Sequence, residues 1–155
     1  MKIRLDSVRL REEDTLFRLL QYSLFEESAG DLNEMNDDAL YDYPWFKHYF
    51  TDDNRWAYLI REQETDKLLG FVMVKTQEEP ATGYTIAEFM VIPKYRRRSV
   101  GRQAAVACFD RFQGNWKVSP AMGSDKAYAF WKNVIDAYTG GNNRFEDDAF
   151  LFSNL

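Results

Sequence analysis

The chain has 155 residues, of which 45% are hydrophobic and 16% aromatic, and its formal net charge at pH 7 is −5. This length fits one compact domain, residues 1–155, and the apolar content excludes an intrinsically disordered chain. The acidic balance argues against a general nucleic-acid partner, because such a protein needs a broadly basic face to displace counterions from the phosphate backbone.

Periodicity predicts the elements of the first third of the chain. Residues 2–9 alternate apolar and polar side chains, which predicts a short strand. Residues 12–30 carry leucines at helical spacing after a first turn rich in acids, which predicts a helix that ends before Gly30. The acidic and aromatic residues 31–50 predict short helical pieces around an irregular bend.

The middle of the chain changes to a period of two. Residues 55–62 and 68–75 predict the two strands of a hairpin with its turn in 63–67. Residues 77–83 form a second connection, and a third strand is predicted over 84–93, ending at Pro93.

The last third alternates helices and strands. It predicts a helix over 99–112, a strand over 116–121, a helix over 124–138, and one or two terminal strands within 144–155. The order of all the elements predicts an α+β domain built around one sheet.

Cys108 is the only cysteine, so no disulfide forms within the chain and a reducing compartment is expected. Charges interrupt the apolar residues of the first ten positions, which excludes a secretory signal, and no apolar run is long enough to span a membrane. We therefore expect a cytoplasmic protein with no membrane partner.

The most unusual segment is KYRRRSVGR (94–102), which places five basic residues in the loop after the third strand and the first turn of the helix that follows it. The first N–H groups of a helix have no partner within the helix, and the helix dipole adds positive charge there. With Gly101 admitting a bulky anion and arginines around it, the segment predicts a pyrophosphate-binding loop. Two alternatives stay open, a solubilising loop in which Gly101 serves packing, and a nucleic-acid patch.

The stretch VIPKYR (91–96), followed by Arg96 to Gly101, resembles the V-x-P-x-[YF]-R and [QR]-x-x-G-x-[GA] patterns of the GNAT superfamily of acyl-CoA-dependent N-acetyltransferases. The order of elements resembles that family over nearly the whole chain. The resemblance implies a three-layer α/β/α architecture, a mixed central sheet with helices on both faces, acetyl-CoA as co-substrate and no metal.

The resemblance also implies which residues bind the cofactor, with three departures from the family pattern. Ser99 replaces the first glycine of the motif, Ser124 replaces an asparagine that commonly touches the pantetheine arm, and Trp131 replaces a tyrosine often proposed to protonate the thiolate. The implied set is Met90, Val91, Arg96, Arg97, Arg98, Ser99, Val100, Gly101, Arg102, Gln103, Ser124 and Trp131.

The family chemistry implies direct transfer of the acetyl group to a primary amine of a small molecule or peptide. The predicted general base is Glu88, a carboxylate in an otherwise apolar strand, which we expect to splay from its neighbour beside the thioester. The alternative is an outward-facing Glu88, and an expected bulge in the strand prevents alternation from deciding its face. Tyr128 is the predicted acid, Tyr138 is a second candidate, and departure of the thiolate without an acid stays open.

Tyr22, Glu26 and Glu27 of the first helix, together with the aromatic residues of 41–50, are predicted to line the acceptor site, where acids and aromatic faces suit a cationic amine. The alternative for these aromatic residues is a place in the hydrophobic core. His48 has no partners for a metal site, and Cys108 is expected to be a buried small hydrophobe. The alternative function is an acyl-CoA-binding module without transferase activity. A homodimer is an expectation that rests only on how common closed dimers are.

Overall fold

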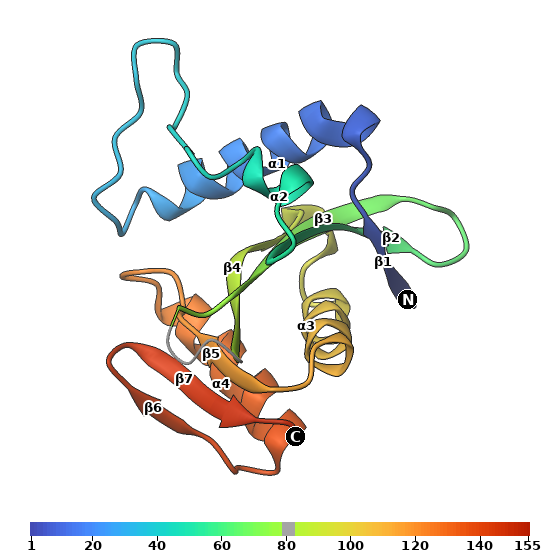
Figure 1. The fold of residues 1–155 in the computed structure, drawn as a ribbon, viewed down its shortest axis with the longest axis vertical. Helices are drawn as coiled ribbons and strands as arrows, with labels where there is room; N and C mark the ends of the chain where they lie inside the picture. The colour runs from blue at the N-terminus through green and yellow to red at the C-terminus, as the bar shows by residue number, and fades with distance from the viewer. Residues whose placement is uncertain (79–82) are drawn as a thin grey trace.

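The computed structural model describes residues 1–78 and 83–155 and contains one seven-stranded sheet in the order β1-β2-β3-β4-β5-β7-β6 (Figure 1). The elements are β1 (Ile3–Ser7), η1 (Leu10–Glu12), α1 (Glu13–Glu27), α2 (His48–Thr51), β2 (Arg55–Glu62), β3 (Leu68–Thr76), β4 (Gly83–Val91), η2 (Pro93–Tyr95), α3 (Val100–Arg111), β5 (Asn115–Val118), α4 (Asp125–Thr139), β6 (Arg144–Glu146) and β7 (Ala149–Ser153).

The predicted elements are confirmed, and the differences lie at their ends. The strand predicted over 84–93 ends at Val91, because Pro93 cannot donate to a ladder and begins η2 instead. The strand predicted over 116–121 is shifted to Asn115–Val118. Within 31–50 the only regular helix is α2, and the connection predicted over 77–83 falls mostly outside the described residues.

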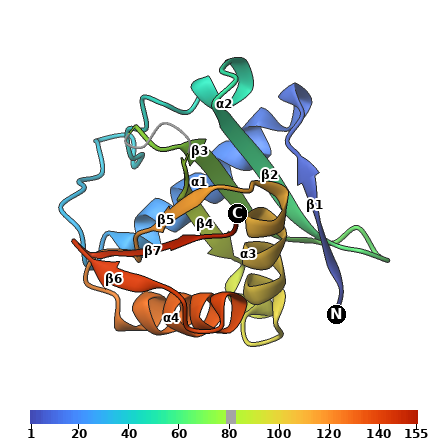
Figure 2. The ribbon, with the colours of Figure 1, turned by 60° about the horizontal axis from the view of Figure 1, so that its bottom comes forward.

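Helices cover both faces of the sheet, as the α+β prediction requires (Figure 2). On one face, here called the α1 face, Leu16 and Leu20 of α1 pack with Phe71 and Met73 of β3. The opposite face, here called the α3 face, buries α3 against the alternate residues of β2 and β3, and α4 joins the same core next to α3, β4 and β7. The side-chain period of two therefore divides one sheet between two hydrophobic cores.

The helix α3 approaches the sheet closely because its inward side chains are small. Ala104, Ala105 and Cys108 are completely buried against the α3 face. Burial raises the pKa of the Cys108 thiol to about 12, so Cys108 is the buried small hydrophobe that the sequence predicts.

The sheet is open at one place, between β4 and β5. These strands pair in parallel only from Gly83 to Thr85 with Asn115 to Lys117, and their pairing stops there. Beyond Thr85 the strand β4 continues for six residues, paired with β3 alone. The predicted splaying of this strand from its neighbour is thus confirmed.

Candidate active site

A bulge in β4 decides which face of the sheet Glu88 occupies. Met73 of β3 pairs with Glu88, but the next residue, Val74, pairs with Ile86, so Ala87 is the extra residue of the bulge. Ile86 belongs to the core of the α3 face, and uninterrupted alternation would place Glu88 beside it. The bulge instead turns Glu88 to the α1 face, where it meets Tyr43.

The Glu88 carboxylate is largely buried and has one hydrogen bond to a neighbouring side chain. The Tyr43 hydroxyl donates to Glu88 Oε2 over 3.2 Å. Burial, and then the like charge of Glu27, raise the pKa of Glu88 to about 8. A carboxyl group with this pKa can accept a proton near neutral pH, as the predicted general base must.

Glu27, at the end of α1, is a second carboxyl group whose pKa is raised, and its charge acts on Glu88. Burial, followed by the charges of Asp31 and Glu26, raises the pKa of Glu27 to about 7. Glu27 was predicted to line the acceptor site, and the structure places its charge where it acts on the predicted base. The two carboxyl groups together form an acidic pair beneath α1.

Tyr43 is one of the aromatic residues of 41–50 that were predicted to line the acceptor site, but sequence reasoning did not pair it with Glu88. It lies in the irregular segment before α2 and is anchored within the aromatic group of the α1 face, with its ring 5.7 Å from that of Trp45. Behind it, Arg55 Nη1 donates to the Tyr49 hydroxyl over 3.4 Å. An aromatic segment without periodicity carries no signal that singles out Tyr43 from its neighbours.

The open edge of β4 presents backbone groups toward β5. Ile92 N–H donates to the Leu69 carbonyl of β3 over 2.8 Å, so by antiparallel alternation Met90 also turns its backbone toward β3. Phe89 and Val91 therefore turn theirs toward the splay, where Arg96 Nε donates to the Val91 carbonyl over 2.8 Å. Of the two β4 residues in the implied cofactor-binding set, Val91 turns its backbone toward the splay and Met90 contributes its side chain to the α1 face.

The loop before α3 has the backbone of an anion-binding site. Arg97 and Ser99 both have left-handed conformations, with φ of 63° and 64°. Alternation of this kind curls successive N–H groups into a concave nest, and no side chain caps the start of α3. The left-handed Ser99 also explains why the family pattern has glycine there, since a side chain is strained in this region.

The arginines of this loop differ in what they bind. Arg96 donates two hydrogen bonds to the Glu26 carboxylate, over 2.9 and 2.7 Å, and this pair lowers the pKa of Glu26. The side chains of Arg97, Arg98 and Arg102 are exposed and have no ion pair within the described part of the chain. The structure therefore joins a predicted cofactor residue to a predicted acceptor residue and leaves three guanidinium groups at the start of α3.

Two residues in the first turn of α3 have structural partners. Gln103 donates to the Met1 carbonyl over 2.7 Å and accepts from Ile3 N–H over 3.2 Å, so its amide ties β1 to α3. A Cβ atom on Gly101 would lie 2.9 Å from the Phe130 ring. Gly101 is thus needed for the close packing of α3 on α4, and the expectation that it leaves room for an anion is replaced by a packing role.

A mostly apolar cavity of about 360 Å³ adjoins the loop, between α1 and the end of β4. It brings together four residues that were predicted separately as cofactor or acceptor contacts: Tyr22, Glu26, Met90 and Arg96. The remaining lining residues are Leu19, Phe25, Ile92 and Pro93. The two sets of predicted residues therefore meet at one place.

The predicted residues of α4 lie on the other side of the splay. Ser124 is the N-cap of α4, and its hydroxyl oxygen accepts a hydrogen bond from Ala127 N–H over 3.1 Å. Trp131 is buried against Phe89, with ring centroids 5.0 Å apart. The Trp131 indole therefore packs against the part of β4 that has no β5 partner.

The two tyrosines considered as acids have different surroundings. The Tyr128 ring packs on Phe145 and Phe150 of the terminal hairpin, and the residue is 40% exposed. The Tyr138 hydroxyl donates to Asp110 Oδ1 over 2.9 Å, near the opposite end of α4. Tyr138 is thus engaged in a structural contact, and Tyr128 stays a prediction.

Within residues 1–78 and 83–155, no three His, Cys, Asp or Glu side chains are grouped as metal ligands. His48 is exposed, with its Nδ1 atom 3.0 Å from Asp52 Oδ2. No helix in the described ranges is long and apolar enough to cross a membrane.

Comparison with known proteins agrees with this geometry. Residues 21–133 match the model of the acetyltransferase (GNAT) family. An acetyltransferase from Thermus thermophilus has a similar structure, with 15% identity and a TM-score of 0.66 over 97% of this chain and 94% of that chain. No curated protein matches the sequence.

Two further structures contain coenzyme A. The spermidine N-acetyltransferase from Vibrio cholerae, in complex with CoA and spermine, is 8% identical, with a TM-score of 0.65 over 97% of this chain and 95% of that chain. A putative N-acetyltransferase from E. coli bound to coenzyme A is 18% identical, with a TM-score of 0.57 over 99% of this chain and 100% of that chain. At such identities the similarity shows the fold alone.

Proposed function

The chain belongs to the acetyltransferase (GNAT) family, and we propose on this basis that it transfers an acetyl group from acetyl-CoA to a primary amine of a small molecule or peptide. One observation carries the proposal. A partly buried carboxyl group with a pKa of about 8, that of Glu88, lies on the stretch of β4 that has no β5 partner.

The residues present fit acetyl-CoA, which supplies the acetyl group as a reactive thioester. The nest at Arg97 and Ser99 offers N–H groups to a pyrophosphate, and the exposed guanidinium groups of Arg98 and Arg102 add positive charge. The backbone of Val91 lies at the open edge of β4, where an N–H group can stabilise negative charge on a thioester oxygen. Ser124 and Trp131 border the same opening from α4.

Glu88 is proposed as the general base. An ammonium acceptor loses a proton to the Glu88 carboxylate, and the neutral amine then attacks the thioester carbonyl directly. Tyr43 holds the carboxylate in place through its hydroxyl group. Tyr128 is kept as the candidate proton donor to the thiolate.

The acceptor is proposed to enter along α1, where the cavity lined by Tyr22 and Glu26 adjoins the carboxyl pair of Glu27 and Glu88. Carboxylates and aromatic faces attract a cationic amine. Structurally similar proteins include a spermidine N-acetyltransferase and a ribosomal-protein-alanine N-acetyltransferase, so both small and peptide amines belong in a first panel.

The test is an acetylation assay with acetyl-CoA and a panel of primary amines, monitored by release of the free thiol. Glu88→Gln should lower kcat/KM by about 10² to 10⁴, the usual contribution of a general base. Glu64→Gln, an exposed residue in the turn between β2 and β3, is the matched control and should have no effect. Saturable acetyl-CoA binding without transfer to any amine would favour the binding-module alternative.

A further inference from the structure

The strand β1 is an edge strand of the sheet, and backbone groups on its outer side have no hydrogen-bond partner among the described residues. Val8 N–H donates to the Ala57 carbonyl and Gln63 N–H donates to the Lys2 carbonyl, so the even-numbered residues of β1 face β2. Ile3, Leu5 and Ser7 therefore face outward. The Ile3 N–H bonds to Gln103, whereas no group of the described residues bonds the outward backbone of Leu5 or Ser7.

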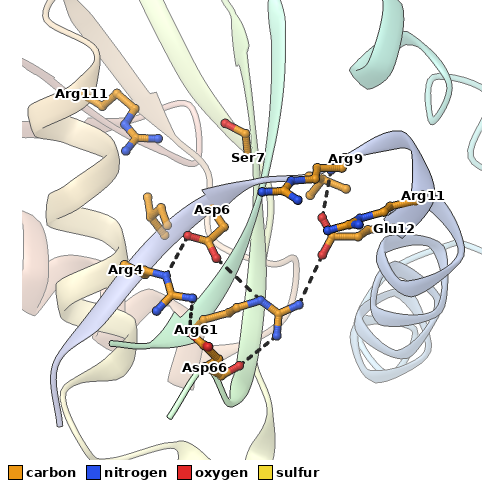
Figure 3. A pocket seen from close by; sticks show the side chains of 11 residues that line it. Arg4, Asp6, Ser7, Arg9, Arg11, Glu12, Arg61, Asp66 and Arg111 are labelled. Atoms are coloured by element: carbon orange, nitrogen blue, oxygen red, sulfur yellow. Dashed lines mark hydrogen bonds and ion pairs between the residues drawn. The ribbon is translucent and has the colours of Figure 1, made fainter. Parts of the chain in front are cut away.

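A hollow of about 770 Å³ follows this free edge (Figure 3). Its lining includes the six consecutive residues Arg4–Arg9, which span most of β1 and the link to η1. Arg11 borders it from η1, and Arg111, at the end of α3, borders it from the other side. The free edge thus lies at the bottom of a groove rather than on a convex surface.

The three carboxylates of the groove, those of Asp6, Glu12 and Asp66, are paired with two arginines, which leaves one net negative charge among these five side chains. Asp6 and Asp66 pair with Arg4, and Arg61 reaches Asp6 over 3.7 Å and Glu12 over 3.3 Å. These contacts form the network of dashed lines in Figure 3. The acids and two of the arginines therefore form a closed framework with little charge to offer a ligand.

Three arginines of the groove remain outside this framework. Arg9, Arg11 and Arg111 form no ion pair with any carboxylate in residues 1–78 or 83–155. The Arg111 guanidinium lies 4.8 Å from the centre of the Tyr58 ring, and Tyr58 is the β2 partner of Ser7. The groove therefore has an excess of positive charge in a chain whose net charge is −5.

We propose that the groove binds an extended acidic peptide segment of another protein, which adds to β1 as a further strand of the sheet. Strand addition supplies main-chain partners for Leu5 and Ser7, and acidic side chains along the peptide pair with Arg9, Arg11 and Arg111. A second copy of this chain is disfavoured as the occupant, since pairing β1 with β1 would bring two arginine-lined grooves together.

The groove is separate from the proposed general base on β4, although the start of α3 adjoins β1 through the hydrogen bond from Ile3 N–H to Gln103. Two strands, β2 and β3, lie between β1 and β4, which at the usual strand spacing is a separation of roughly 14 Å. The proposed binding does not depend on the proposed acetyl transfer. A bound peptide should also leave the acceptor site accessible.

The probe is a fluorescein-labelled peptide of about six residues that alternates glutamate and valine, titrated with the full chain and followed by anisotropy. Arg111→Glu should weaken binding at least about tenfold, because one attraction becomes a repulsion in the groove. Arg18→Glu, an exposed arginine of α1 outside the groove, makes the same charge change and should leave binding within about twofold.

The main-chain part of the proposal has its own test. Ser7→Pro removes an N–H that faces away from β2, and edge strands tolerate proline at such positions, so β1 should persist while peptide binding falls. The same peptide with N-methyl groups on alternate residues tests the ladder without any change to the protein, and should bind at least about tenfold more weakly. Equal binding of the N-methylated peptide would overturn strand addition.

Two further results would also overturn the proposal. The first is equal affinity for a peptide that alternates lysine and valine, which would remove the charge argument. The second is self-association of the chain, measured by sedimentation, that Ser7→Pro abolishes, because the occupant would then be a second copy.

Discussion

The hydrogen bond between Tyr43 and Glu88 predicts how acetylation responds to pH. The Tyr43 hydroxyl stabilises the ionised Glu88 carboxylate, so Tyr43→Phe should raise the pKa of Glu88 above about 8. Short hydrogen bonds to carboxylates span about 2.5 to 2.7 Å, and this one spans 3.2 Å. We therefore take a modest contribution of about 1 kcal/mol, which corresponds to a shift of roughly 0.7 pH units.

The assay is kcat/KM for one amine acceptor across the pH range, expressed as the ratio of wild type to variant so that the titration of the acceptor cancels. At pH 7.5 a shift of this size lowers the ionised fraction of Glu88, and hence kcat/KM, by about fourfold. The ratio should return to one well above the pKa of the variant. Tyr41→Phe, which removes another hydroxyl from the same core cluster, should leave the profile unchanged.

A substitution at Glu27 should shift the pKa of Glu88 in the opposite direction, downward. The charge of Glu27 raises the pKa of Glu88, so Glu27→Gln should move the same limb of the profile to lower pH. Asp31 and Lys75 also act on Glu88, with opposite signs, and both remain in each variant. A ratio for Tyr43→Phe that is constant with pH would refute the reasoning, because a merely structural role lowers activity equally at every pH.

The remaining predictions concern stability. Glu88 and Glu27 keep their protons to a higher pH in the folded chain than in the unfolded chain. The free energy of unfolding should therefore rise as pH falls from 8 to 6, by roughly 2 kcal/mol for Glu88 alone. Urea unfolding of Glu88→Gln should show a smaller rise over the same pH range. Ser124→Ala should cost about 1 kcal/mol through loss of the α4 cap, with Ser124→Asn restoring it, as measured by denaturant midpoint. Gly101→Ala should destabilise the fold by about 1 to 3 kcal/mol, because the added methyl group meets the Phe130 ring. In thermal unfolding, adding Phe130→Leu to this variant should recover part of the lost stability. An unchanged Tm for Gly101→Ala would contradict the packing role.

Sequence patterns predicted β2 and β3 well because these two strands are long and a clear turn separates them. The strand over 55–62 was predicted with the bounds that the structure shows, since apolar alternation and a clear turn define both ends. The helix ends around Gly30 and Ser124 follow from the same local rules. Such features depend on neighbours in the chain, and the sequence contains them.

The active-site details depend on contacts between distant segments. The face of Glu88 is decided by one bulged residue, Ala87, which no alternation pattern reveals. Tyr43 reaches Glu88 from 45 residues away, through a segment without periodicity. Gly101 was interpreted as space for an anion because the Phe130 ring that fills that space comes from another helix.

The most direct test of the proposed function is a calorimetric titration of the chain with acetyl-CoA, free coenzyme A and a short DNA duplex, repeated with Arg97→Glu and Arg98→Glu combined. The proposal predicts saturable binding of both CoA forms, none of the duplex, and at least about tenfold weaker CoA binding by the variant, because two attractions at the start of α3 become repulsions. Absence of CoA binding, or equal binding by the variant, would contradict it.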